Sequence, residues 1–103
     1  MTIGILGQAN PTANTNTTVY TVPAGLYASV TLNVVNTGAS AATVTVAIAS
    51  SAIPTASEYI EYLTILPVGG VLERGGLVAQ AGERFVVNCS TANCSVSIYG
   101  FEQ

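Results

Sequence analysis

The sequence predicts an all-β fold: a single-domain antiparallel β-sandwich, jelly-roll-like, with about eight strands and an extended N-terminal arm. Three observations favour this fold. Apolar and polar residues alternate over short runs, which is the pattern of strands with one buried face. Residues that favour turns separate these runs at short intervals. No segment repeats apolar residues at helical spacing between helix caps, and 103 residues suffice for one domain.

The N-terminal residues 1–16 are predicted to be an arm and linker, and residues 17–103 the sandwich domain. A short apolar run over 2–7 precedes a polar, proline-containing segment that cannot bury enough surface to order itself independently. Such arms often add a strand to the edge of a neighbouring sheet. The alternative, a first strand of the same domain joined by a long loop, fits these residues equally well.

The next strands follow in order from residue 17. Thr17–Val22 is rich in β-branched and aromatic residues, and the Val22–Gly25 segment has proline and glycine where a type I turn favours them. Residues 27–36 and 42–48 alternate in polarity. We expect these two strands to pair as a hairpin around the Asn36–Ser40 loop.

The second half of the chain continues the pattern with shorter elements. Residues 50–57 contain Pro54 and are expected to cross between the sheets as a loop. The most aromatic strand spans 58–66. Two short strands separated by Gly75-Gly76 follow, and then a final hairpin. The expected bounds of these last elements are 71–73, 77–80, 85–89 and 94–101.

The chain lacks the side chains on which most catalysis depends. It contains no His, Lys, Asp or Trp, and its acids and bases are five Glu and two Arg. General acid–base catalysis and metal binding both need more than this, so we expect no enzyme activity and no cofactor. No basic patch exists for nucleic acid, and no apolar stretch is long enough for a membrane helix. Without a recognisable signal peptide, we expect the chain to fold in the cytoplasm.

The surface is predicted to be neutral and covered by a partner. Charged residues make up 7% of the chain, against about 25% in an ordinary globular protein. An uncharged surface has little to keep copies apart, so we expect a homo-oligomer, dimer or trimer, rather than an unusually uncharged monomer. The candidate interface residues are apolar residues of the arm, two tyrosines and three charged residues: Ile3, Ile5, Leu6, Tyr59, Tyr62, Glu73, Arg74 and Arg84.

Two of these groups allow a second interpretation. The charged residues are either ion pairs across strands or subunits, or simply solvated strand ends, and we favour the latter. The tyrosines could form a sugar-binding face, because rings stack and hydroxyls form hydrogen bonds. We favour ordinary packing, since no amides cluster near them along the chain.

Cys89 and Cys94 are separated by four residues. A hairpin loop of that length would place them opposite each other, close enough for a disulfide at a non-hydrogen-bonded pair. The interpretation that we favour is a pair of buried, reduced thiols acting as small apolar side chains, as a reducing cytoplasm allows. The spacing is not that of a C-x-x-C redox motif.

Eight short turn and strand motifs are distributed over nearly the whole chain. They are Leu6–Ala9, Val19–Gly25, Val34–Gly38, Glu58–Tyr62, Gly70–Arg74, Ala81–Glu83, Ser90–Val96 and Tyr99–Glu102. In this order they resemble the small virion proteins of tailed bacteriophages, including phages of cyanobacteria and marine bacteria. The cysteine pair is not part of that pattern.

The resemblance implies a structural protein of the virion, assembled in the bacterial cytoplasm. The leading expectation is a capsid decoration, or cement, protein that binds the major capsid protein or other virion proteins. The alternative is a tail or fibre module that takes part in assembly or binds a host receptor. A small hydrolytic enzyme is remote, because a general base is missing.

Overall fold

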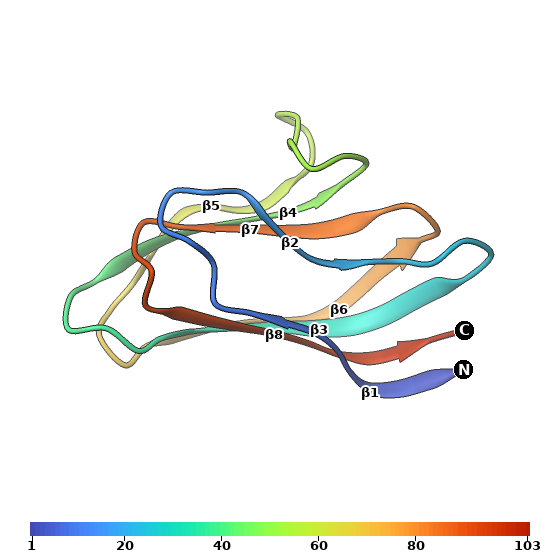
Figure 1. The fold of residues 1–103 in the computed structure, drawn as a ribbon, viewed down its shortest axis with the longest axis horizontal. Helices are drawn as coiled ribbons and strands as arrows, with labels where there is room; N and C mark the ends of the chain where they lie inside the picture. Colours follow the sequence, from blue (N-terminus) through green and yellow to red (C-terminus); the bar gives the residue numbers. More distant parts are fainter.

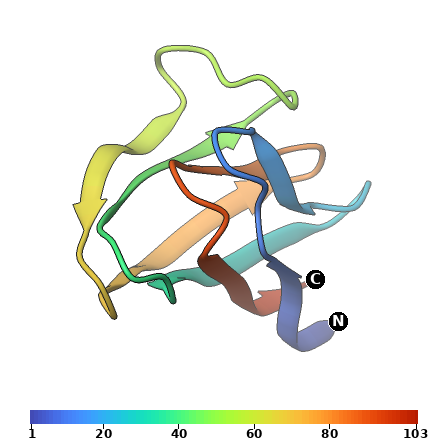
Figure 2. The ribbon, with the colours of Figure 1, turned by 60° about the vertical axis from the view of Figure 1, so that its left-hand side comes forward.

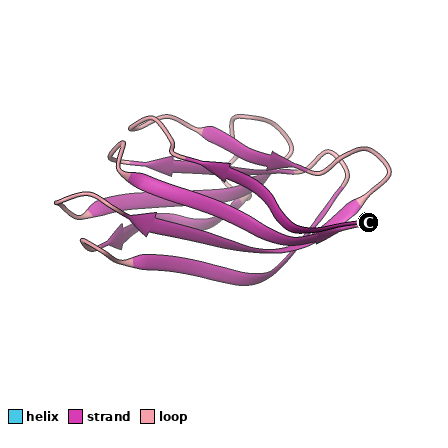
Figure 3. Ribbon diagram, turned by 60° about the horizontal axis from the view of Figure 1, so that its bottom comes forward, coloured by secondary structure: helices cyan, strands magenta, loops and turns pink.

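The computed structural model describes residues 1–103 as two facing antiparallel sheets of four strands each, without helices (Figures 1 and 3). Sheet A has the strand order β1-β8-β3-β6, and sheet B has the order β2-β7-β4-β5. The strands are β1 (Thr2–Ala9), β2 (Thr17–Thr21), β3 (Tyr27–Asn36), β4 (Ala42–Ala49), β5 (Tyr59–Leu66), β6 (Val71–Gln80), β7 (Arg84–Cys89) and β8 (Cys94–Glu102).

The strand order is that of a jelly roll, which confirms the predicted fold. The first half of the chain pairs with the second half in reverse, β1 with β8, β2 with β7, β3 with β6 and β4 with β5. This long antiparallel ribbon is then rolled up, so that β8 also pairs with β3, and β7 with β4. Two sheets built in this way face each other across one core.

The expected hairpins are wrong. β3 and β4 lie in different sheets, as do β7 and β8, so the 37–41 and 90–93 loops cross between the sheets. The 50–58 loop, expected to cross, instead joins β4 to β5 within sheet B and projects beyond it (Figure 1). The alternation of apolar and polar residues shows which face of a strand is buried. The same alternation results whether the next strand pairs beside it or lies across the core, so it does not identify the partner strand.

The extended N-terminal arm is also not what the structure shows. β1 pairs with β8 from Thr2↔Glu102 to Ala9↔Val96 and forms an edge of sheet A, beside the C-terminus (Figure 2). The following linker is fixed to the domain, because Asn10 Nδ2 donates to the carbonyl oxygens of Ala92 (2.9 Å) and Cys94 (2.6 Å). The alternative interpretation, a first strand of the same domain, describes the chain.

The core lies between the two sheets and consists of the inward side chains of both. Its 18 buried residues include Phe85, Leu32 and Ile98, which are fully enclosed, and the Phe85 ring stacks on Tyr20 with centroids 6.2 Å apart. Each large apolar side chain buried in this way contributes about 1.5–3 kcal/mol relative to exposure. The core is thus the alternating apolar residues that the sequence pattern predicts.

Register irregularities occur in all four edge strands, and two of them, in β6 and β5, bear on the predictions and on the surfaces described below. β6 is continuous rather than two short strands, because Gly75 and Gly76 together oppose Thr31 and Gly76 adopts φ = 69°. In β5, Tyr62 and Leu63 together oppose Thr45, between the pairs Val44↔Thr64 and Val46↔Glu61. Leu63 has φ = 51°, a left-handed conformation that is uncommon for a residue with a side chain. A bulge re-aims the side chains around it, here those of an exposed tyrosine and leucine.

Candidate interaction surfaces

The outer face of sheet A carries exposed apolar side chains in adjoining rows. Register places Ile3, Phe101 and Val78 in one row, with Ile5 and Tyr99 in the next. The side chains of Ile3 and Val78 are 74% and 65% exposed. Val71 is also exposed at the far end of β6, separated from these rows by the row of Glu73, Asn33 and Ser97. Together we call these residues the apolar face: Ile3, Ile5, Val71, Val78, Tyr99 and Phe101.

The apolar face has a single charged side chain in its rows, and that charge is engaged. Glu73 accepts hydrogen bonds from the Tyr99 hydroxyl at 3.1 Å and from Asn33 Nδ2 at 3.5 Å. Partial burial, and then the Glu73 carboxylate, raise the pKa of Tyr99. The other positions in these rows include Ser29, Thr31 and Ser97. A face of this composition offers no charge repulsion to another neutral surface, and contiguous apolar patches commonly mark interaction sites.

The free edge of β1 adjoins the apolar face. β1 ends the strand order of sheet A, so one of its two edges has no partner strand. It is eight residues long and contains neither Lys nor Pro, the residues that commonly block an exposed edge, and its one register irregularity lies at Leu6. Its unpaired backbone groups can therefore accept a further strand.

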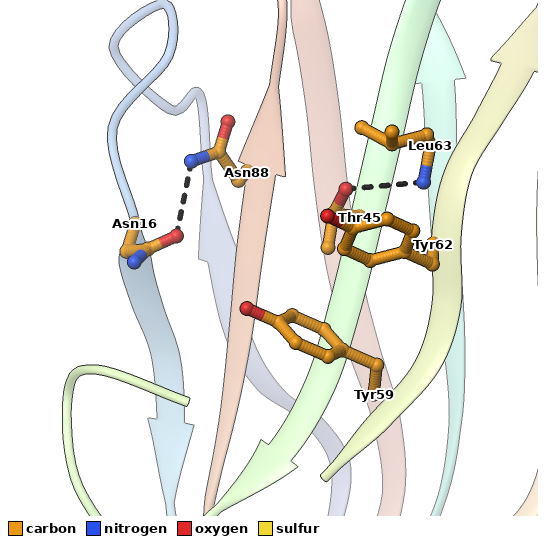
Figure 4. A pocket seen from close by; sticks show the side chains of 6 residues that line it. All are labelled: Asn16, Thr45, Tyr59, Tyr62, Leu63 and Asn88. Carbon is orange, nitrogen blue, oxygen red and sulfur yellow. Dashed lines mark hydrogen bonds between the residues drawn. The ribbon is translucent and has the colours of Figure 1, made fainter. Parts of the chain in front are cut away.

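The outer face of sheet B is hollowed across β7, β4 and β5, beside the segment that leads into β2 (Figure 4). Register aligns Asn16, just before β2, with Asn88 of β7 and Thr45 of β4, and Thr45 with the Tyr62–Leu63 bulge of β5. The middle of this row holds short side chains, while β5 holds large ones. The result is an open hollow of about 290 Å³, lined by Asn16, Thr45, Tyr59, Tyr62, Leu63 and Asn88.

The polar groups of the hollow are partly paired and partly free. Asn88 Nδ2 donates to Asn16 Oδ1 at 3.0 Å, and the Leu63 amide donates to Thr45 Oγ1 at 3.2 Å. The rings of Tyr59 and Tyr62 meet edge to face with centroids 5.1 Å apart. Asn16 Nδ2, Asn88 Oδ1 and both tyrosine hydroxyls have no partner within the chain, and no charged side chain lines the hollow.

The remaining predicted interface residues, Arg74, Arg84 and Leu6, lie outside both the apolar face and the hollow. Arg74 of β6 forms an ion pair with Glu61 of β5 and donates to the carbonyl oxygen of Ile60 at 3.0 Å, which links the edges of the two sheets. Hydrogen bonds from Thr64 and then Arg74 lower the pKa of Glu61. Arg84 is the first residue of β7, and its backbone lies between Thr21 of β2 and Ala49 of β4 in sheet B. Leu6 packs against the core.

The structure therefore gathers Ile3, Ile5 and Glu73 on sheet A, and Tyr59 and Tyr62 on sheet B. Sequence reasoning missed Asn16 and Asn88, because they lie far along the chain from the tyrosines and only the jelly-roll pairing brings them together.

Cys89 and Cys94 meet across the core rather than across a hairpin. They end β7 in sheet B and begin β8 in sheet A, and both are fully buried free thiols in the core cluster. Burial, and then the neighbouring Cys94 thiol, raise the pKa of Cys89 to about 12. Since the thiolate is the reactive species, a thiol with this pKa is inert at neutral pH.

The chain has no group of three or more His, Cys, Asp or Glu side chains placed to hold a metal ion. It also has no helix long and apolar enough to span a membrane. Comparison with protein-family models, with curated proteins and with solved structures found no match to this chain.

Proposed function

We propose that the protein is a structural component of a phage virion, a capsid decoration protein that attaches to the shell through the apolar face. The observation that carries the proposal is the outer face of sheet A, where Ile3, Ile5 and Val78 are exposed and the one carboxylate is tied to Tyr99 and Asn33. The resemblance of the sequence to small virion proteins is the reason for proposing a phage particle as the partner. The jelly roll agrees with it, since this fold recurs in viral capsid domains.

The size of the face suits a weak contact repeated many times. Four strands about 4.8 Å apart and about nine residues long at 3.3 Å each present about 570 Å². Covering this face and an equal area of the shell buries about 1,100 Å², near the lower limit for a specific interface. Pairing of copies along the β1 edge would give the homo-oligomer expected from the composition, and linked copies bind a repetitive shell with avidity.

Binding to shells that lack this protein tests the proposal. Ile3→Glu places a charge in the apolar face, and Ile53→Glu is a matched control, because both isoleucines are 74% exposed and Ile53 lies in the 50–58 loop. Neither change removes core packing, so equal thermal midpoints are expected. We expect Ile3→Glu to weaken shell binding at least tenfold and Ile53→Glu to leave it unchanged. Equal binding by both variants would remove the apolar face from the account.

A second candidate is a tail or fibre module that binds a host receptor, and the hollow on sheet B favours it. The number of copies per particle separates the two candidates. A decoration protein is present in proportion to the capsid subunits, whereas a tail or fibre component is present in few copies. Quantitative mass spectrometry of purified particles measures this ratio directly.

A further inference from the structure

The hollow on sheet B lies on the side of the sandwich opposite the apolar face. A chain attached through sheet A would therefore leave the hollow open to solvent. Its lining contributes nothing to the proposed attachment, and it combines aromatic rings with free amide and hydroxyl groups. These features point to a ligand of its own.

The chemistry of the lining selects a neutral, hydroxyl-rich ligand. Tyrosine rings offer apolar surface to the C–H groups of a sugar ring, and their hydroxyls add hydrogen-bonding capacity. Asn16 Nδ2 supplies free donors and Asn88 Oδ1 a free acceptor, which suits hydroxyl groups, since each hydroxyl both donates and accepts. No Arg lines the hollow, so an anionic ligand would find no opposite charge.

The volume and the fixed geometry agree with this choice. A cavity of about 150 Å³ accepts a benzene ring, so a hollow of about 290 Å³ has room for one six-membered sugar ring with its hydroxyl groups. The bond from the Leu63 amide to Thr45 Oγ1 holds the bulge that presents Tyr62. A left-handed residue of this kind costs about 1–3 kcal/mol, and such strain clusters at ligand sites. The wall is thus ordered before any ligand arrives, which reduces the entropy lost on binding.

We propose that this hollow binds one unit of a neutral saccharide. The sugar ring packs against Tyr59 and Tyr62, and its hydroxyls bond to Asn16 Nδ2 and Asn88 Oδ1. With one open hollow per chain, we expect millimolar affinity for a single unit. Many copies on one particle would raise the effective affinity for a glycan-covered surface.

Nuclear magnetic resonance titration of the isotope-labelled chain tests the proposal. The probes are glucose, galactose, mannose and N-acetylglucosamine, with sialic acid as the anionic comparison. We expect at least one neutral sugar to shift the side-chain amide signals of Asn16 and Asn88 in a saturable way below about 50 mM, as millimolar affinity requires. If no neutral sugar shifts these signals, or if the shifts map elsewhere, the proposal is overturned.

Variants then locate the binding. Tyr62→Ala removes a ring that is 65% exposed and is expected to weaken binding at least tenfold, and Tyr27→Ala, an exposed tyrosine of sheet A, is the control that should bind normally. Tyr62→Phe keeps the ring and should retain most of the affinity. Unchanged binding by Tyr62→Ala contradicts the proposal. Shell binding by the same variants reports separately on the apolar face, so the two proposals can fail independently.

Discussion

Asn36 fixes three segments at one end of the sandwich, and its removal should be severe. The side chain ends β3 and is 1% exposed. Its Nδ2 donates to the carbonyl oxygens of Ser40 (2.8 Å), Leu66 (3.1 Å) and Pro67 (3.3 Å), and its Oδ1 accepts from the Gly38 amide at 3.0 Å. One amide group thereby ties the β3–β4 loop and the β5–β6 turn to the core.

The magnitude follows from these contacts. Asn36→Ala removes the two Nδ2 hydrogens, which three carbonyl oxygens share, and the Oδ1 acceptor, so about three hydrogen bonds are lost at about 0.5–1.5 kcal/mol net each. We therefore expect a loss of about 3 kcal/mol, a large share of the 5–15 kcal/mol that stabilises a typical domain. At about 4–8 °C per kcal/mol for a domain of this size, the thermal midpoint should fall by about 12–24 °C.

Two further variants sharpen the experiment, which is thermal and urea unfolding followed by circular dichroism. Asn36→Asp keeps the shape but turns an oxygen toward three carbonyl oxygens, so it should be at least as destabilising as alanine at neutral pH. Asn33→Ala is the control, because Asn33 makes one long bond, at 3.5 Å, on an open face. A midpoint for Asn36→Ala within about 3 °C of the wild type, less than 1 kcal/mol, would refute this reasoning.

Two other predictions concern pH and backbone packing. Burial, and then the Glu102 carboxylate, raise the pKa of Tyr20 from 10.0 to about 12, and the pKa of Cys89 rises from 9.0 to about 12. The unfolded chain releases these protons at lower pH than the folded chain, so the free energy of unfolding is full below pH 9 and falls as the pH rises to 12. In urea titrations between pH 9 and 12, Tyr20→Phe should lose less stability than the wild type. An identical decline in both proteins would contradict this assignment. Gly100→Ala should prevent stable folding, because Gly100 has φ = 151° and a Cβ there would lie 2.2 Å from a β3 carbonyl oxygen. Gly75→Ala is the control, since its Cβ would meet no atom closer than 3.6 Å. Soluble yield and the thermal midpoint distinguish the two variants, and equal midpoints would contradict this packing.

The strands could be predicted from the sequence, but their partners could not. Alternation over 27–36 and 42–48 marks two half-buried strands, and both exist as β3 and β4. A short loop rich in Gly, Ser and Asn serves a hairpin and a crossing between sheets equally well. The pairing of β3 with β6 and β8 depends on how the whole ribbon rolls up, and no local pattern reports that. The same ambiguity placed Cys89 and Cys94 in one predicted hairpin.

The interaction surfaces divide in the same way. Ile3 and Ile5 could be selected from the sequence, because an apolar run that is followed by a polar, proline-containing segment is either exposed or paired at the edge of a sheet. The hollow could not be foreseen, because Asn16 and Asn88 lie 72 residues apart and meet through the register of β2 with β7. One local signal was present in the short side chain of Thr45 beside the large ones of β5, since this contrast leaves space on the outer face of a sheet.

Attachment through the apolar face of sheet A is the central claim, and a cryo-electron microscopy map of the intact particle tests it most directly. We expect jelly rolls of this chain to cover the shell in many copies, with Ile3, Ile5 and Val78 against capsid subunits and the 50–58 loop pointing outward. A map in which these side chains face solvent, or in which the chain is absent from the shell, would contradict the claim.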